Sequence, residues 1–186
     1  VSSSMPIRDM ETFATQLPEG CRVYFNRGVN GIDGIVSSAL GVARERGGPV
    51  LLVTGDIAFL HNLNAAAGEG LRDIPLVVLL LNNDGGEIFD MLPVRDFEPA
   101  FTRHFVTPQC ADFAAACAVF GIPHRLVEAT NDIHAAIDEA FGAHALRVIE
   151  VRTAIAESGA VRRELLRRPR KVSTSCGFGA GAGGGG

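Results

Sequence analysis

An aspartate and an asparagine each follow a run of apolar residues, and together they could hold a metal ion. Asp56 ends the run PVLLVTGD, and Asn83 ends the run PLVVLLLNN. If the two runs are neighbouring strands of a parallel sheet, both side chains reach the edge where such sheets bind ligands. A carboxylate, an amide oxygen and nearby backbone carbonyls form a set of hard oxygen ligands suited to Mg²⁺.

The same residues also have a simpler interpretation as turn formers. TGD and NNDGG are common turn sequences, and two such turns carry no function by themselves. The metal interpretation has a consequence of its own, because Mg²⁺ usually binds through few protein oxygens together with substrate phosphates. A metal here therefore implies a phosphorylated ligand, and the small-residue helices expected after each strand would offer it their N-terminal amides.

Apolar runs alternate with helical patterns along the chain, and this alternation places both turns on one sheet. We expect strands over residues 21–25, 49–56, 75–83, 123–129 and 146–152, and helices over residues 34–47, 63–73, 110–121 and 131–143. Asn131 or Asp132 is the expected N-cap of the last of these helices. The pattern predicts an α/β fold, a mostly parallel sheet with helices on both faces.

Length and composition indicate one globular α/β domain. The chain has 186 residues, 47% of them hydrophobic and 20% charged, and its net charge of −4 argues against a nucleic-acid surface. The longest apolar run, IPLVVLLL, is too short to span a membrane. We expect a domain over residues 1–155, a C-terminal helix over 156–170 and a disordered glycine-rich tail over 171–186.

The charged C-terminal stretch and the thiol and imidazole side chains have simple interpretations. The basic run 162–171 lacks interleaved aromatic residues, which favours a solvated helix end over a contact with RNA or lipid. The cysteines form no CxxC pair, so we expect neither zinc nor disulfides and interpret Cys110 and Cys117 as core residues. His61 follows Asp56 closely and is either a surface histidine or a proton-transfer group. With no signal-peptide pattern, a cytoplasmic location is expected.

The spacing of the two turns resembles the diphosphate-binding signature of thiamine diphosphate enzymes. In that family GD is followed, after about two dozen residues, by NN; here 24 residues separate Gly55-Asp56-Ile57 from Asn82-Asn83. The resemblance implies the thiamine diphosphate-binding fold, with thiamine diphosphate and Mg²⁺ or Mn²⁺ as cofactors. It places the metal on Asp56, Asn83 and the carbonyl of Gly85. The other cofactor contacts that it implies are Ser4, Asn30, Ile32, Gly55, Ile57, Ala58, Gly86 and Ile88.

Further stretches are similar to one branch of this family. The segments 2–13, 25–41 and 82–93 resemble the C-terminal domain of the 2-succinyl-5-enolpyruvyl-6-hydroxy-3-cyclohexene-1-carboxylate synthases of menaquinone biosynthesis. Those transferases decarboxylate 2-oxoglutarate and add the succinyl-semialdehyde carbanion to isochorismate. The resemblance covers about residues 1–155 and implies a homodimer or homotetramer. The alternatives are another thiamine diphosphate enzyme, acetolactate-synthase-like or a 2-oxo acid decarboxylase, and a non-catalytic α/β binding module.

The resemblance also assigns residues to the substrates, which carry several carboxylates. Arg8 and Arg27 match arginines of the active site, and the planar guanidinium suits carboxylates because it binds both oxygens. From composition alone, a surface ion pair is the better interpretation of each arginine. Ser4 matches a serine near both cofactor and substrate. Phe89 and Leu92 would form an apolar wall of the substrate pocket, or could be core residues.

Ile32 completes the catalytic set that the resemblance implies, together with Arg8 and Arg27. It matches an apolar residue that keeps the cofactor bent, so that its amino group lies close to the reacting thiazolium carbon. Two positions depart from the family pattern. Ala58 stands where relatives often have a hydroxyl group, and Glu87 places a negative charge beside the diphosphate unless its side chain faces solvent.

One part of the family's active site has no counterpart in this sequence. The glutamate that hydrogen-bonds the aminopyrimidine ring lies, in that family, on a separate N-terminal pyrimidine-binding domain. The chain begins at a valine, which suggests a piece of a longer protein. We therefore expect the 186-residue chain alone to bind Mg²⁺ and thiamine diphosphate weakly and to be inactive.

Overall fold

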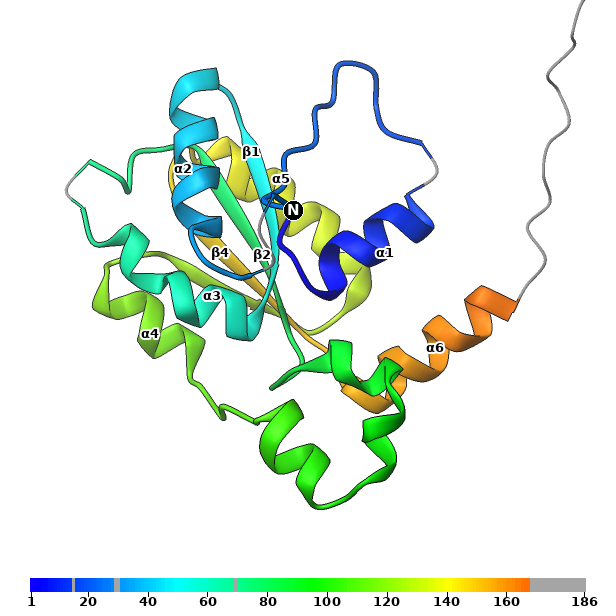
Figure 1. Ribbon diagram of the computed structural model, residues 1–186. Helices are drawn as coiled ribbons and strands as arrows, with labels where there is room; N and C mark the ends of the chain where they lie inside the picture. The colour runs from blue at the N-terminus through cyan, green and yellow to red at the C-terminus, as the bar shows by residue number, and fades with distance from the viewer. Residues whose placement is uncertain (15, 29–30, 69, 168–186) are drawn as a thin grey trace, which may run out of the picture.

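A four-stranded parallel sheet forms the centre of the computed structural model, which describes residues 1–14, 16–28, 31–68 and 70–167 (Figure 1). The strands are β1 (Val50–Gly55), β2 (Leu76–Asn82), β3 (His124–Val127) and β4 (Arg147–Arg152). Their order is β1-β2-β4-β3, and every neighbouring pair is parallel. The predicted parallel sheet is therefore confirmed, and the carboxyl ends of β1 and β2 lie side by side.

Helices cover both faces of the sheet, as the alternating pattern predicts. One face packs against α2 (Ile35–Arg46), α3 (Asp56–Asn62) and α4 (Phe113–Val119), and the other against α5 (Ile133–Gly142). The residues of β2 alternate between the two cores: Leu76, Val78 and Leu80 belong to the first, and Val77 to the second. All four are buried, which explains why this strand is apolar without a break.

The other elements lie around the carboxyl ends of the strands. Helix α1 (Met5–Phe13) contacts β1, and α6 (Ile155–Arg167) packs on the short turn η2 (Glu87–Met91). A lobe beyond β2 contains η2, η3 (Pro93–Asp96) and η4 (Thr102–Val106). The remaining helical turns are η1 (Leu63–Ala66) and η5 (Thr130–Asp132). No helix within the described part of the chain is long and apolar enough to cross a membrane.

The strand expected over residues 21–25 is wrong. This segment is described and forms no strand, while β1 lies at the edge of the sheet. The first residues of the chain lie between the two: the terminal amine of Val1 donates to the carbonyl of Tyr24 at 2.8 Å, and the N–H of Ser2 donates to that of Val53 at 2.9 Å. Ser2 therefore takes the hydrogen bond at Val53 on the free edge of β1 that a strand over residues 21–25 would have made.

The helix expected over residues 63–73 is also wrong in its position. Helix α3 begins at Asp56, directly after β1, and only the turn η1 follows it. Ala58 and Phe59 are buried in the first core, so the helix must start early enough to place them there. After β2 the chain forms the turn η2 in place of the expected small-residue helix.

The other helices lie near their predicted positions, with ends set by local residues. Gly47 ends α2 with a φ of 62°, a conformation that glycine adopts readily. Asp112 caps α4, because its carboxylate accepts the N–H of Ala115 at 2.9 Å. This late start leaves Cys110 outside the helix and exposed, so its assignment to the core is wrong. Cys117 is buried as predicted.

Two further predictions concern chain segments near the ends. The N-cap of α5 is Asp132, although its side chain makes no capping hydrogen bond. The predicted C-terminal helix exists as α6, and it begins one residue earlier than expected, at Ile155. The predicted tail over 171–186, together with Cys176, lies outside the described residues.

A buried glutamate connects three strands. Glu150 is 1% exposed and accepts hydrogen bonds from Asn82 Nδ2 at 2.7 Å and Arg152 Nε at 3.1 Å, while His124 Nε2 lies 2.8 Å from its other oxygen. Burial by itself would raise the pKa of Glu150, but the hydrogen bonds from Asn82, Arg152 and His124 outweigh it and hold the pKa below its usual value.

We expect Glu150→Gln to destabilise the fold by about 1–3 kcal/mol near neutral pH, because donors on three residues lose a charged acceptor. Since the folded pKa of Glu150 is lowered, its contribution is present above the unfolded pKa and is lost as the pH falls through the folded one. Urea unfolding between about pH 5 and about pH 3 should show a weaker acid dependence in the variant. The exposed Glu128→Gln is the control, and an equal loss of stability in both variants would contradict the assignment.

Candidate functional site

The ends of β1 and β2 bring Asp56 and Asn83 together. In the sheet register Gly55 pairs with Leu81, so both strands end at the same edge. Asp56 Oδ2 accepts the N–H of Gly85 at 2.9 Å, and Asn83 Oδ1 accepts the same N–H at 3.2 Å. Two side-chain oxygens from residues that directly follow different strands thus converge on one backbone group.

Asp56 is a buried carboxylate held by backbone groups. It is 3% exposed, and its Oδ1 accepts the N–H of Ile57 at 2.7 Å. Burial raises the pKa of Asp56, although hydrogen bonds from Ile57 and Gly85 act in the opposite direction. Among the residues that the structure describes, Asp56 forms no ion pair. A divalent cation would offset this buried charge, so the donor set suits a hard metal ion.

The turn after β2 is hydrogen-bonded to residues of the segment 105–110. Asp84 has a φ of 57°, and its Oδ1 accepts the N–H groups of Gln109 at 2.9 Å and Cys110 at 2.6 Å. Gly86 donates to the carbonyl of Val106 at 2.8 Å. These bonds hold the Gly85 carbonyl and the Asn83 side chain in one arrangement.

Close packing explains why this turn contains two glycines. Gly85 has a φ of 155°, and a Cβ there would lie 2.5 Å from the carbonyl oxygen of Val106. A Cβ on Gly86 would lie 2.5 Å from the carbonyl oxygen of Phe105. Backbone oxygens have little freedom to move, so neither position accepts a side chain.

Gly85→Ala should therefore destabilise the chain by about 2–4 kcal/mol, from backbone strain and overlap with Val106. Urea unfolding of the purified variant measures the loss. Gly41→Ala is the matched control, because Gly41 lies within α2 with open space around it, and alanine there should stabilise the helix slightly. Equal stability of the two variants would contradict the packing argument.

A buried amide fixes the turn that carries Ile32. Asn62 is 5% exposed; its Nδ2 donates to the carbonyls of Ile32 and Ala58, and its Oδ1 accepts the N–H of Ile35 at 3.1 Å. The side chain of Ile32 packs partly against the first core, and that of Ala58 is buried in it. Sequence reasoning missed Asn62, although an amide within the otherwise apolar stretch IAFLHNL is a signal that could have found it.

The predicted substrate arginines lie near α1 and make local contacts. Arg8 Nη1 donates to the carbonyl of Ser4, the N-cap of α1, at 2.7 Å. Arg27 Nη1 lies 3.5 Å from Glu11 Oε1, in a largely exposed ion pair. No hydrogen bond or ion pair within the described residues joins either arginine to Asp56. The structure therefore groups Ser4 with Arg8, and separately Asp56 with the turn after β2.

Of the remaining predicted positions, Ile88 and Phe89 lie in the turn η2 and Leu92 directly follows it. Phe89 packs edge-on against Phe105, with ring centroids 5.5 Å apart, and Leu92 is 49% exposed. Ile88 is half-buried within η2. His61 is half-exposed beside Asp33, which suits a surface histidine. Asn30 lies outside the described residues.

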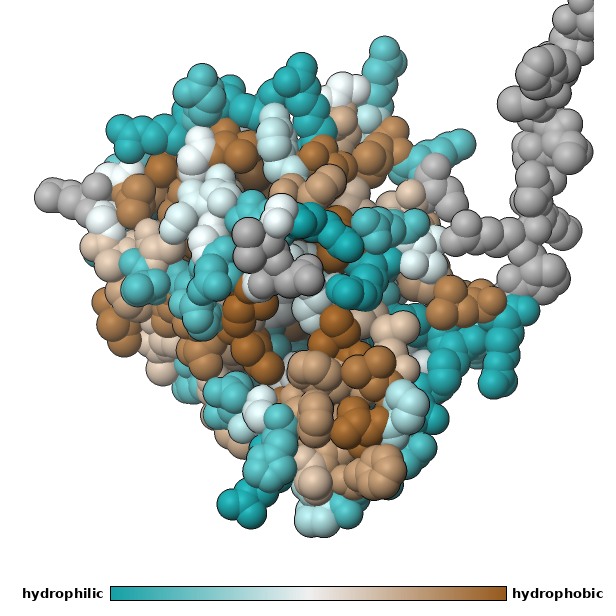
Figure 2. Space-filling view, viewed as in Figure 1, coloured by the Kyte–Doolittle hydropathy of each residue, from teal (hydrophilic) through white to brown (hydrophobic). Residues whose placement is uncertain are grey.

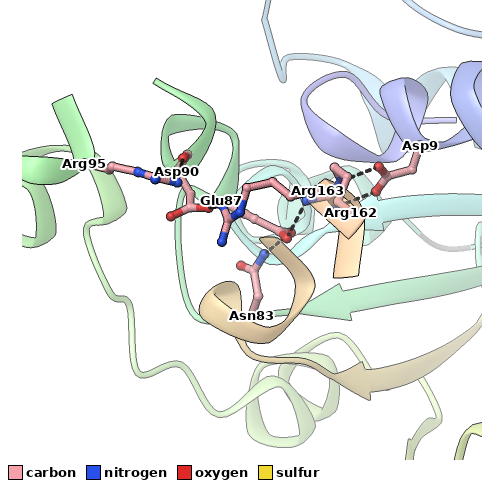
Figure 3. Close-up of polar contacts among 7 residues, drawn as sticks. All are labelled: Asp9, Asn83, Glu87, Asp90, Arg95, Arg162 and Arg163. Atoms are coloured by element: carbon pink, nitrogen blue, oxygen red, sulfur yellow. Dashed lines mark hydrogen bonds and ion pairs between the residues drawn. The ribbon is translucent and has the colours of Figure 1, made fainter. Parts of the chain in front are cut away.

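Glu87 does not face solvent, because it contacts Asn83 and Arg162. Glu87 is 9% exposed; its Oε2 accepts Asn83 Nδ2 at 2.8 Å, and its Oε1 accepts Arg162 Nη1 at 3.0 Å (Figure 3). The side chain of Arg162, expected on a solvated helix end, is only 12% exposed. The opposite charge of Arg162 explains how a carboxylate is tolerated beside this turn.

Comparisons with known proteins agree with this geometry. Residues 11–151 match the family described as thiamine pyrophosphate enzyme, C-terminal TPP binding domain. A relative from Synechococcus sp. (strain JA-3-3Ab), named 2-succinyl-5-enolpyruvyl-6-hydroxy-3-cyclohexene-1-carboxylate synthase, is 43% identical over 90% of this chain and 28% of its own length. A protein of the same name from Thermosynechococcus vestitus is 48% identical over 73% of this chain and 24% of its own.

Solved structures show the same fold. A thiamin diphosphate-dependent enzyme isolated from Mycobacterium smegmatis superimposes with a TM-score of 0.61, at 24% identity, over 80% of this chain and 27% of its own. Benzoylformate decarboxylase from Polynucleobacter necessarius gives a TM-score of 0.55 at 19% identity, over 63% of this chain and 23% of its own. The chain thus spans only about a quarter of the length of such proteins. It belongs to the thiamine pyrophosphate enzymes and carries their C-terminal, cofactor-binding domain.

Proposed function

We propose that this chain is the diphosphate- and Mg²⁺-binding domain of a 2-succinyl-5-enolpyruvyl-6-hydroxy-3-cyclohexene-1-carboxylate synthase. The observation that carries the proposal is the convergence of Asp56 Oδ2 and Asn83 Oδ1 on the N–H of Gly85. Relatives that bear this name are 43% and 48% identical to most of the chain. The activity would be that of a transferase in menaquinone biosynthesis, converting 2-oxoglutarate and isochorismate.

Three groups would hold the metal: the carboxylate of Asp56, Oδ1 of Asn83 and the carbonyl of Gly85. All are hard oxygen donors, and they leave positions open for water and for a diphosphate. The backbone around β1 and α3 and the turn that carries Ile32 would meet the rest of the cofactor. Thiamine diphosphate, when bound, supplies the electron sink for decarboxylation, while the protein supplies orientation and electrostatics.

The substrate side of the site would involve Ser4, Arg8, Arg27, Phe89 and Leu92. Arg27 pairs here with Glu11 through one long contact, which a substrate carboxylate could replace with a bidentate pair. Arg8 has an exposed guanidinium anchored at the start of α1. Two cationic groups that both contact α1 or its N-cap would favour a substrate with more than one carboxylate.

The domain organisation follows from the same proposal. Residues 1–155 would form the cofactor domain, completed by a pyrimidine-binding domain outside this chain and assembled as a cytoplasmic homodimer or homotetramer. Apolar side chains gather on the surface of the lobe beyond β2, where Met91, Leu92 and Phe97 are each about half exposed or more (Figure 2). Exposed apolar surface of this kind is typical of an interface.

Substrate preference tests the proposed reaction. With a pyrimidine-binding domain supplied, the assembly should consume 2-oxoglutarate only when isochorismate is present and should turn over pyruvate poorly. Arg27→Ala should lower kcat/KM for 2-oxoglutarate by roughly 10–100-fold, through loss of a charged contact. The exposed Arg44→Ala of α2 is the control. A preference for pyruvate alone would instead favour an acetolactate-synthase-like or decarboxylase activity.

A further inference from the structure

A series of polar contacts leads from the proposed metal ligand Asn83 to Asp9 of α1 (Figure 3). Asn83 Nδ2 donates to Glu87, Glu87 accepts from Arg162, and Arg162 donates to Asp9. These residues come from four segments: the end of β2, the turn η2, α6 and α1. Arg162 lies at the centre of this series of contacts, and no metal or cofactor role requires it.

The contacts of Arg162 are short and well directed. Its Nε and Nη2 each donate to one carboxylate oxygen of Asp9 at 2.7 Å, and its Nη1 donates to Glu87 Oε1 at 3.0 Å. The fork-to-fork contact with Asp9 fixes the plane of the guanidinium, and the third nitrogen then fixes the carboxylate of Glu87. The side chains of Arg162 and Glu87 are 12% and 10% exposed, so water competes weakly for these bonds.

Glu87 in turn decides which way the amide of Asn83 points. A carboxylate only accepts hydrogen bonds, so it selects the NH₂ end of the amide. The other end, Oδ1, then faces the N–H of Gly85 beside Asp56. With the amide reversed, NH₂ would face the proposed cation site and two oxygens would face each other at Glu87.

We propose that Arg162 is a positioning residue for the metal site, acting through Glu87 on Asn83. The proposal rests on the proposed function, because it takes Asn83 Oδ1 as a metal ligand. Arg162 holds Glu87 in place and offsets its charge, so that Glu87 orients the amide without drawing the cation to itself. It also joins α1, which carries Arg8, to the turn that carries the metal ligands.

Binding of Mn²⁺ in the presence of thiamine diphosphate tests this role without turnover. The electron paramagnetic resonance signal of free Mn²⁺ is lost on binding, so a titration of the chain gives its affinity. Arg162→Ala should weaken binding by roughly 10–100-fold, as removal of groups that support metal ligands usually does. Arg163→Ala is the matched control: it removes the neighbouring ion pair to Asp90, at 2.9 Å, which does not touch Asn83.

A second substitution separates positioning from a general structural effect. In the double variant Arg162→Ala with Glu87→Gln, glutamine still accepts from Asn83 Nδ2 but carries no charge to compete for the cation. We expect this variant to regain about tenfold of the lost affinity. Glu87→Gln also removes the unpaired charge that Arg162→Ala leaves on Glu87, so urea unfolding of both variants is measured beside the titration. If Arg162 were purely structural, the affinity would only follow the regained stability, whereas a positioning role predicts weaker binding by Arg162→Ala even where the chain is fully folded.

The orientation of Asn83 can be tested with Arg162 left intact. Glu87→Gln keeps an acceptor for the amide, whereas Glu87→Met has a similar shape and none. The glutamine variant should bind Mn²⁺ about tenfold more tightly than the methionine variant. This comparison remains decisive if Arg162→Ala fails to fold.

The possible outcomes distinguish the two proposals. Thiamine diphosphate-dependent Mn²⁺ binding by the unaltered chain, weakened by Arg162→Ala and not by Arg163→Ala, supports the positioning role. Equal affinities for the two arginine variants, or for the two Glu87 variants, would overturn that role and leave the metal site standing. No such Mn²⁺ binding by the unaltered chain, and no change with Asp56→Asn, would overturn the proposed function itself.

Discussion

Asp56→Asn should remove the Mg²⁺-dependent part of thiamine diphosphate binding, lowering the affinity on the order of 100-fold or more. The substitution keeps the size of the side chain and replaces a negatively charged ligand with a neutral one. Asp56 is the only carboxylate among the three proposed ligands, so no other ligand supplies negative charge to the ion. Burial raises the pKa of Asp56, against hydrogen bonds from Ile57 and Gly85 that lower it, and a cation beside the carboxylate would offset the cost of burying its charge.

Calorimetric titration with thiamine diphosphate, with and without Mg²⁺, measures this effect. The unaltered chain should give heat that depends on Mg²⁺, and Asp56→Asn should give none at millimolar cofactor. Asp33→Asn is the control, because its side chain is 84% exposed and lies beside His61. Metal-dependent heat that survives in Asp56→Asn would contradict the metal assignment, and metal-independent binding in both would favour a non-catalytic module.

The strands that position this site could be predicted because their short, continuous apolar sequences favour buried strands over other elements. The runs that became β1 and β2 are apolar over most of their length. Both faces of β2 pack against helices, whereas β1 packs through Leu52 against the first core and leaves Leu51 36% exposed. Parallel pairing of such strands places the residues after them at one edge. The adjacency of Asp56 and Asn83 was therefore predictable from two local patterns and one rule of topology.

The errors arose where a partner distant in sequence decides the local structure. The segment 21–25 has strand character, but the edge of β1 beside it is bonded by Ser2. The start predicted for α3 is too late, because the small residues that follow this helix have a more helical composition than the turn after β1. What fixes that start is the burial of Phe59, which depends on the other helices.

The role of Arg162 shows the same limit at the site itself. A basic run at the end of a chain is usually solvated, and nothing nearby in the sequence contradicts this for Arg162. Its two partners, Asp9 and Glu87, lie 153 and 75 residues away. Glu87 looked unfavourable beside a diphosphate for the same reason: the charge that offsets it comes from another helix.

The 186-residue chain alone should show no synthase turnover with Mg²⁺, thiamine diphosphate, 2-oxoglutarate and isochorismate. The proposed metal ligands and the arginines would bind the diphosphate and the substrate carboxylates. Proton removal from the cofactor also requires a glutamate hydrogen-bonded to its aminopyrimidine ring, and the resemblance places that glutamate on a pyrimidine-binding domain.

Adding that domain as a separate chain, or fusing it ahead of Val1, should restore turnover by several orders of magnitude, since positioned acid–base catalysis alone contributes about 10²–10⁴-fold. Replacing the glutamate of the added domain with glutamine is the control: it should abolish the rate and leave Mn²⁺ binding by Asp56 and Asn83 unchanged. A substantial rate from the chain alone would show that its own residues activate the cofactor. The exposed apolar lobe offers a second measure, because Leu92 and Phe97 should become protected from solvent when the domains associate.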